Sequence, residues 1–303
     1  MSTITDRIRE LKQQRQAVIL AHTYQPGDVQ DIADFVGDSY GLSVEASRVE
    51  SDCIVFCGVL FMAETAAILN PTRTVLIPEP TAGCPMADMI EPSELEELRR
   101  QYPDHLVMCY VNSTAEIKAL SDVCCTSANA LTIAGKLPAD RGIIFVPDKH
   151  LGDHIAEQTG REMVLWKGFC PTHVRIAEQM LHDARRRHPG APIMIHPEAP
   201  RPCRHLADQV LSTGGMCRFV ADDPHEEYVV ATEVGIIHTL QKRNPQKRFH
   251  PLDKAITCPN MKLGSLESVL RALEGSGGME VSVPPAVAEK ARTSLEKMLE
   301  MSR

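Results

Sequence analysis

The fold of this chain is indicated by three segments, TVLIPEPTAGCPM (74–86), MVLWKGFCPTH (163–173) and RFHPLDKAITCPNM (248–261). Each segment contains a short apolar run, typical of a β-strand, and then a Cys-Pro dipeptide. The three cysteines, Cys84, Cys170 and Cys258, are separated by 86 and 88 residues. This spacing predicts an internal repeat of three units, in which three equivalent thiols can meet at one point.

The first strand of each unit repeats with offsets of 88 and 86 residues, as VILAHTY (18–24), LVMCYVN (106–112) and PIMIHPE (192–198). These strands are apolar on both faces, which is expected of parallel strands covered by helices. Polar residues stand at matched places where the strands end, and the carboxyl ends of such strands are where α/β sheets bind ligands. They are His22, Tyr110 and His196, followed by Tyr24, Asn112 and Glu198.

A second matched block reads ADFVGDS (33–39), SDVCCTS (121–127) and ADQVLST (207–213). It aligns Ser39, Ser127 and Thr213, which we expect to open helices as N-cap residues. Alternating strands and helices predict right-handed crossovers and a parallel sheet in each unit. A four-strand pattern that matches itself is also general among α/β folds, although four polar positions with the same offsets favour a true repeat.

The predicted fold class is therefore α/β, with three αβα domains related by a pseudo-threefold axis around a central active site. Each domain has a small parallel sheet. The expected division is an N-terminal helix at 1–17, repeat units at 18–101, 102–188 and 189–275, and a C-terminal helix at 276–303.

Composition and charge exclude several classes of protein. The 303 residues are 43% apolar without an uninterrupted apolar run of membrane-spanning length, and the N-terminus lacks the apolar core of a signal peptide. We therefore expect a cytosolic protein that does not enter a membrane. A net charge of −8, one Trp and five Tyr argue against a nucleic-acid surface.

Ten cysteines in a cytosolic chain indicate metal ligands or buried apolar groups rather than disulfides. Three solitary thiolates would satisfy three corners of a [4Fe-4S] cluster and leave one iron open as a Lewis acid. A catalytic zinc with three cysteines would satisfy the same spacing, and thiolates favour either metal over hard cations. The other cysteines are expected to be small buried apolar residues: Cys53, Cys57, Cys109, Cys124, Cys125, Cys203 and Cys217.

A few further side chains can be assigned from their context. His173 follows Cys170 closely and is a candidate for a supporting role beside it. Met86 and Met261 follow the first and third of the Cys-Pro dipeptides and are expected to pack around the cluster. We expect a solvated surface position for His150, His154, Arg185, Arg186 and Arg187.

Taken together, several motifs closely resemble those of quinolinate synthase, over essentially the whole chain. They are AHTYQ, DIADFVGDS, FMAE, ILNP, Cys-Pro-Met, YVNST, TSAN, CPTH, HPE, STGG, GIIH and CPNMK. The resemblance implies an enzyme of NAD biosynthesis that condenses iminoaspartate with dihydroxyacetone phosphate to quinolinate, releasing phosphate and water. It also implies three similar domains and a [4Fe-4S] cluster held by one cysteine from each.

The resemblance further implies roles for individual residues. The cluster ligands would be Cys84, Cys170 and Cys258. The chemistry that such a reaction needs, rather than the resemblance, makes Glu198 the leading candidate for a base, with His22, Tyr24, Tyr110 and His196 as proton donors or orienting groups. The substrate-binding set would be His22, Ser39, Tyr110, Val111, Asn112, Ser127, His196, Pro197, Glu198 and Thr213.

Partners and departures follow from the same resemblance. An aspartate-oxidising enzyme is expected to supply the unstable iminoaspartate. Pro259 stands at a position that varies in the family, and the C-terminal Cys-x-x-Cys of some longer members is missing.

Two other functions remain open at this point. One is a reductive dehydroxylase of isoprenoid synthesis, also trilobed around a three-cysteine cluster, and the other is a non-catalytic iron-sulfur or zinc scaffold.

Overall fold

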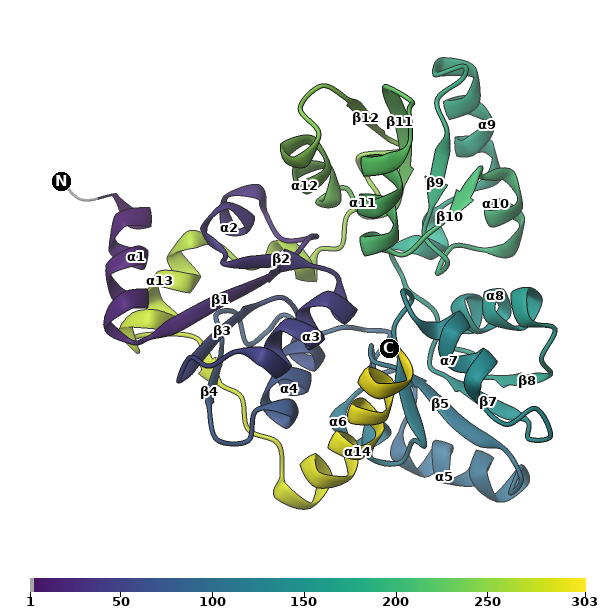
Figure 1. Cartoon of the computed structure of the whole chain (residues 1–303), viewed down its shortest axis with the longest axis horizontal. Coiled ribbons are helices and arrows are strands. Elements are labelled where there is room, and N and C mark those ends of the chain that lie inside the picture. Colours follow the sequence, from purple (N-terminus) through teal and green to yellow (C-terminus); the bar gives the residue numbers. More distant parts are fainter. Residues whose placement is uncertain (1–2) are drawn as a thin grey trace.

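The computed structural model describes residues 3–303 and contains three parallel sheets arranged around a common centre (Figure 1). If the four repeated strands of each sheet are numbered in chain order, all three sheets have the order 2-1-3-4. Helices cover the sheets, so the predicted fold class of three αβα domains is confirmed. We call the three sheets with their helices units 1, 2 and 3.

Unit 1 has the sheet order β13-β4-β3-β1-β2, in which β13 alone is antiparallel to its neighbour. Every residue of β1 and β3 is buried, because helices pack on both faces of the sheet. The elements are β1 (Ala17–His22), α2 (Gly27–Ile32), β2 (Phe35–Gly37), α3 (Ser39–Arg48), β3 (Cys53–Cys57), α4 (Leu60–Leu69) and β4 (Thr74–Ile77).

Unit 2 repeats this arrangement with the sheet order β6-β5-β7-β8. Its strands β5, β6 and β7 are buried along their whole length. The elements are α5 (Pro92–Gln101), β5 (Leu106–Tyr110), α6 (Ala115–Ala119), β6 (Val123–Cys125), α7 (Ala130–Lys136), β7 (Ile143–Val146), α8 (Lys149–Thr159), β8 (Met163–Leu165) and the short 3₁₀ helix η1 (His173–Arg175).

Unit 3 has the sheet order β10-β9-β11-β12. Its elements are α9 (Glu178–Arg187), β9 (Ile193–Ile195), α10 (Arg201–Leu206), β10 (Gln209–Val210), α11 (Thr213–Asp222), β11 (Glu227–Ala231), α12 (Ile236–Arg243), β12 (Arg248–Pro251) and the 3₁₀ helix η2 (Asn260–Lys262).

The terminal elements join the units. Helix α1 (Ile4–Gln14) packs against α13 (Leu266–Glu274), and β13 (Met279–Glu280) extends the sheet of unit 1. Helix α13 therefore lies on unit 1, although its residues fall within the range 189–275 that the sequence assigned to the third repeat unit. Helix α14 (Pro285–Met301) packs on α4 of unit 1 and on α6 and β6 of unit 2 (Figure 1). None of the described helices combines the length and apolar composition needed to cross a membrane.

Two sequence expectations about local structure are wrong. The N-caps are Asp38 for α3 and Ser212 for α11, so Ser39 and Thr213 are the first helical residues and do not cap. In unit 2 the N-cap of α7 is Asn129, two residues after Ser127. Each motif carries adjacent residues that can cap a helix, and the pattern alone does not choose between them.

The second correction concerns α8, whose histidines were expected on a solvated surface. His154 is buried and His150 is half-buried, because α8 packs against α7 and α10. The three arginines at the end of α9 are exposed, as predicted. The expectation of buried cysteines is confirmed for Cys53, Cys57, Cys109, Cys124, Cys125 and Cys203, whereas Cys217 is half-buried.

Candidate active site

A cavity of about 130 Å³ lies where the three units meet, and all three contribute residues to its wall. It is lined mainly by residues that follow the carboxyl ends of strands, the edge where open α/β sheets bind ligands. Val111 and Pro197 are buried beside it without lining it. The other residues proposed from the sequence all line the cavity: His22, Tyr24, Ser39, Cys84, Tyr110, Asn112, Ser127, Cys170, His196, Glu198, Thr213 and Cys258.

Glu198 is the centre of a buried hydrogen-bonded group. Its Oε1 accepts the Tyr110 hydroxyl at 2.6 Å, and its Oε2 lies 2.7 Å from Nδ1 of His173. Burial opposes ionisation of Glu198, but His173, His196 and the two hydrogen bonds outweigh it, and they hold the pKa of this carboxyl well below its usual range. Glu198 is therefore an ionised carboxylate in a site almost without water contact.

The group continues from His173 to Tyr24 through a residue that the sequence did not single out. Nε2 of His173 lies 2.7 Å from the Thr232 hydroxyl, which in turn lies 2.7 Å from the Tyr24 hydroxyl. Because Nδ1 of His173 faces the Glu198 carboxylate, Nδ1 donates to it, and Nε2 contacts the Thr232 hydroxyl. Five side chains from three units thus form one continuous path of hydrogen bonds between Tyr24 and Tyr110.

His22 and His196 occupy equivalent positions at the ends of β1 and β9 and make equivalent contacts. Nδ1 of His22 accepts the backbone N–H of Tyr24 at 3.1 Å, and Nδ1 of His196 accepts that of Glu198 at 3.3 Å. Burial is the main cause that lowers the pKa of each imidazole to about 3. Both rings are therefore neutral near pH 7, with the proton on Nε2.

The two tyrosines are poor acids in this setting. Burial raises the pKa of Tyr24 and of Tyr110 well above the usual value, and the charge of Glu198 raises both further. Tyr24 also lies 3.1 Å from the Thr213 hydroxyl of α11. The tyrosines therefore hold their protons and act as hydrogen-bond donors until a neighbouring group accepts one.

The three cysteines follow the fourth strand of each sheet, β4, β8 and β12, and each is half-buried in the cavity wall. Burial raises the pKa of Cys84 to about 12 and also raises the pKa of Cys170 and Cys258. Charge on Cys258 would raise the pKa of Cys84, and charge on Cys84 that of Cys170. Without a metal the three thiols stay protonated, and a thiophilic metal would displace those protons.

The spacing of the thiols bears on which metal could fit. Cys170, His173 and Glu198 have ligand atoms within 4.8 Å of one another, but Cys84, Cys170 and Cys258 do not form such a set among residues 3–303. Thiolates that share one tetrahedral zinc stand only about 3.8 Å apart, given Zn–S bonds of about 2.3 Å. Thiolates bound to three different irons of a cubane stand farther apart, so the three cysteines fit a cluster better than a single ion.

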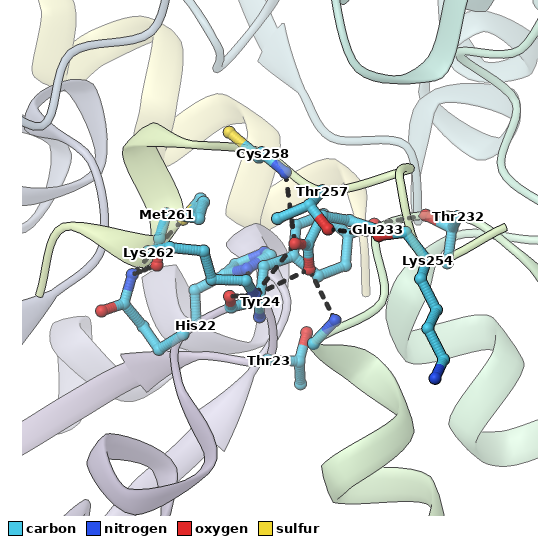
Figure 2. Close-up of polar contacts among 12 residues, drawn as sticks. His22, Thr23, Tyr24, Thr232, Glu233, Lys254, Thr257, Cys258, Met261 and Lys262 are labelled. Carbon is cyan, nitrogen blue, oxygen red and sulfur yellow. Dashed lines mark hydrogen bonds and ion pairs between the residues drawn. The ribbon is translucent and has the colours of Figure 1, made fainter. Parts of the chain in front are cut away.

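A second buried polar group, centred on Glu233, supports the loop that carries Cys258 (Figure 2). Its Oε1 lies 2.9 Å from Nζ of Lys262 and accepts the Cys258 backbone N–H at 3.2 Å. Its Oε2 accepts the backbone N–H of Gly235 at 2.7 Å, and Lys262 also donates to the Tyr24 carbonyl. The position of Cys258 is thereby tied to the strand end that carries Tyr24.

Comparison with known proteins identifies the family. The family model described as quinolinate synthetase A protein matches residues 6–300. The chain belongs to this family. It is 48% identical over 296 residues to a quinolinate synthase of Dehalococcoides mccartyi, covering 98% of this chain and 97% of that protein. It is also 48% identical to the quinolinate synthases of Thermodesulfovibrio yellowstonii (97% of both chains) and Thermus thermophilus (98% of this chain, 96% of the relative).

The structure adds residues to the quinolinate synthetase A site that sequence reasoning missed. Thr232 and Glu233 end the third strand segment of unit 3, EYVVATE, at the same sheet edge as His196. Their position could have identified them as site residues, because ligands bind where buried parallel strands end. Asp38 also lines the cavity, beside Ser39. It was not predicted as a site residue because it caps helix α3, which already explains an Asp at this position. His173, assigned only a supporting role from the sequence, lies within the path of hydrogen bonds.

Proposed function

We propose that this protein condenses iminoaspartate with dihydroxyacetone phosphate to form quinolinate, with release of phosphate and water. Its family membership makes it an enzyme related to quinolinate synthases, which serve NAD biosynthesis. The observation that carries the specific proposal is one cavity that holds three thiols from three units together with the path from Tyr24 to Tyr110. A scaffold or sensor has no need for such a path.

The cofactor we propose is a [4Fe-4S] cluster held by Cys84, Cys170 and Cys258. Three half-buried thiols on three separate loops, spaced too widely for one ion, support this choice over zinc. Such a cluster, when bound, supplies one iron without a protein thiolate that acts as a Lewis acid toward a substrate oxygen or nitrogen. Met86 and Met261 are buried in the cavity wall and would pack beside it.

Both substrates are anions, and the cavity offers neutral hydrogen-bond donors for them. Helices α3 and α11 begin at Ser39 and Thr213, so the hydroxyls of these two residues lie at the cavity, whereas the first-turn N–H groups of Gly41 and Gly214 are already bonded to Asp38. Ser127 and Asn112 add donors from unit 2. The neutral imidazoles of His22 and His196 donate through Nε2. We propose that these groups orient the two carboxylates and the carbonyl oxygens.

Glu198 is our proposed base, because it is ionised and out of contact with bulk water. Isomerisation and dehydration each require a proton to be taken from carbon and another to be returned to oxygen. Glu198 can itself return the proton that it takes from carbon to a departing oxygen, while His173, in contact with Thr232 and through it with Tyr24, keeps donating to Oε2 of Glu198. Tyr110 donates to the same carboxylate and keeps its second oxygen oriented.

The catalytic proposal is tested with Glu198→Gln in anaerobically purified protein. The amide keeps the size and the contact with Tyr110 but takes no proton, so we expect kcat to fall by about 10²–10⁴ with unchanged iron content. Glu227→Gln, at the outer end of β11, is the matched control and should keep full activity. Full turnover by Glu198→Gln with an intact cluster would remove Glu198 from the role of base.

The cofactor proposal is tested by iron and sulfide analysis. Single Cys→Ser changes at 84, 170 and 258 should each reduce bound iron sharply, whereas Cys57→Ser, inside strand β3, should not. A colourless protein with one zinc would contradict the cluster. Quinolinate formation without an added reductant separates this enzyme from a reductive dehydroxylase, which needs electrons from a partner.

The source of iminoaspartate and the cellular compartment stay predictions from the sequence. Because iminoaspartate hydrolyses readily, we propose that an aspartate-oxidising enzyme supplies it, in the cytosol. A coupled assay checks the supply: addition of such an enzyme with aspartate should replace chemically generated iminoaspartate and yield quinolinate.

A further inference from the structure

A second cavity, of about 370 Å³, lies between units 1 and 3 beside the catalytic one. Asp38 lines both cavities. Thr23, which lines the second, stands between the catalytic-cavity residues His22 and Tyr24, and Gly214 directly follows Thr213. A wall about one residue thick therefore separates the two spaces.

Two exposed arginines and the carboxylate of Asp38 line this second cavity, so its wall carries one more positive charge than negative. Arg218 is on α11 and Arg243 ends α12. Within residues 3–303 neither has a carboxylate at salt-bridge distance, whereas Arg185 and Arg248 of the same unit are paired with Asp208 and Glu227.

The charges of both guanidinium groups affect the same residue, Cys217. Burial raises the pKa of Cys217, another lining residue; Arg243 and Arg218 counteract this rise, and the charge of Asp38 adds to it. Among residues 3–303, only one donor of Arg243 has a protein partner, the Val36 carbonyl at 3.1 Å. Most of the hydrogen-bond donors of both arginines therefore remain available to a ligand.

One of the contacts between units 1 and 3 that close the wall between the cavities joins Asp38 to Gly214. Oδ2 of Asp38 accepts the backbone N–H of Gly214 at 3.0 Å. A Cβ at position 214 would lie 2.5 Å from that oxygen and 3.4 Å from Nη1 of Arg218. Arg218 thus lies over the first turn of α11, next to this contact. Thr23, 2% exposed in the same wall, has a buried hydroxyl without a partner among the described residues.

We propose that this second cavity binds a phosphate group and is where dihydroxyacetone phosphate docks before it enters the catalytic cavity. The inference rests on the proposed function. Paired arginines bind phosphate oxygens through several charge-assisted hydrogen bonds. The chain carries a net charge of −8, so an anionic substrate needs a local positive site to concentrate it. The Asp38–Gly214 contact is then the point at which the path to the catalytic cavity opens.

The binding experiment uses inorganic phosphate as probe, titrated calorimetrically into the cluster-loaded protein in a phosphate-free buffer. Quinolinate is added at saturating concentration to fill the catalytic cavity, so that the heat of phosphate binding comes only from the second cavity. We expect Arg218→Met with Arg243→Met to weaken phosphate binding on the order of tenfold or more. Arg218→Lys should retain part of the affinity, and Arg186→Met on α9 should retain all of it. Equal affinity in the wild type and the double variant would overturn the site.

The kinetic experiment connects the site to substrate. At low ionic strength the KM of the double variant for dihydroxyacetone phosphate should be several-fold higher than that of the wild type, while its kcat stays within about twofold. Added salt should make the two KM values more alike, because it screens the charge of the arginines. If the double variant loses phosphate binding but keeps the wild-type KM at every salt concentration, the second cavity binds only released phosphate. That result would overturn its role in docking the substrate. Absence of quinolinate formation by the wild type would instead refute the proposed function, whereas the difference in phosphate affinity between the wild type and the double variant can also be measured without quinolinate.

Discussion

Glu233 and Lys262 form an ion pair whose removal should measurably destabilise the loop of Cys258. Glu233 is fully buried and accepts hydrogen bonds from Lys262 and from the backbone N–H groups of Gly235 and Cys258. Glu233→Gln removes the charge and places an amide NH₂ against these donors. Breaking a buried ion pair costs about 3–5 kcal/mol. Because the Lys262 side chain is 26% exposed, we expect the unfolding free energy to fall by an amount at the lower end of this range, about 3 kcal/mol.

The measurement is a double-mutant cycle in urea, on the cluster-free protein, with Glu233→Gln, Lys262→Met and the double variant. We expect a coupling energy of about 2 kcal/mol, because each single change leaves the other partner unsatisfied. The exposed pair Glu227–Arg248 in the same unit is the matched control, with an expected coupling below about 1 kcal/mol.

The outcome for the cluster follows from the same contacts. Since Glu233 fixes the Cys258 backbone, the loaded Glu233→Gln variant should lose iron to a chelator faster than wild type, followed as decay of the cluster absorbance. A Glu233–Lys262 coupling no larger than that of the control pair would refute the reasoning, because the pair would then be as solvated as a surface contact.

Three further predictions concern buried groups. The pKa of His22 and of His196 is about 3, below the ordinary 6.5, so the unfolded chain binds their protons more tightly. Their joint contribution should lower the unfolding free energy by about 2–3 kcal/mol per pH unit as pH falls from 6 to 4, and a slope unchanged in His→Gln variants would contradict this. Lys118→Met should cost about 2–3 kcal/mol in urea unfolding, because it leaves the carbonyls that Lys118 binds without a donor; no loss would mean that water replaces it. Gly214→Ala should cost about 1–3 kcal/mol through its clash with Asp38, and Asp38→Ala should relieve the clash, so additive losses in the double variant would argue against the contact.

The repeat made much of the fold predictable. Equal offsets between the strand segments that end at His22, Tyr110 and His196 predicted three equivalent sheets, and the structure has three sheets of identical strand order. This succeeded because apolar strands and helix-start motifs are local signals that recur in each unit. Where two capping residues stand side by side, as at Asp38 and Ser39, local signals were insufficient and the predicted cap was wrong.

The path between Tyr24 and Tyr110 depends on contacts across units that no local pattern encodes. Thr232 looks like an ordinary strand end until unit 3 places it between Tyr24 of unit 1 and His173 of unit 2. The burial of His154 likewise depends on how α8 packs against its neighbours.

The amino-acid sequence alone determined that three similar α/β units would each present a cysteine and polar strand ends, because periodicity and local propensity act within about ninety residues. Only the tertiary structure decided which side chains form one path of hydrogen bonds, which carboxylate anchors the Cys258 loop, and where Arg218 and Arg243 line one cavity. Those properties depend on distances of a few ångströms and on exclusion of water, and both arise only when the three units pack together.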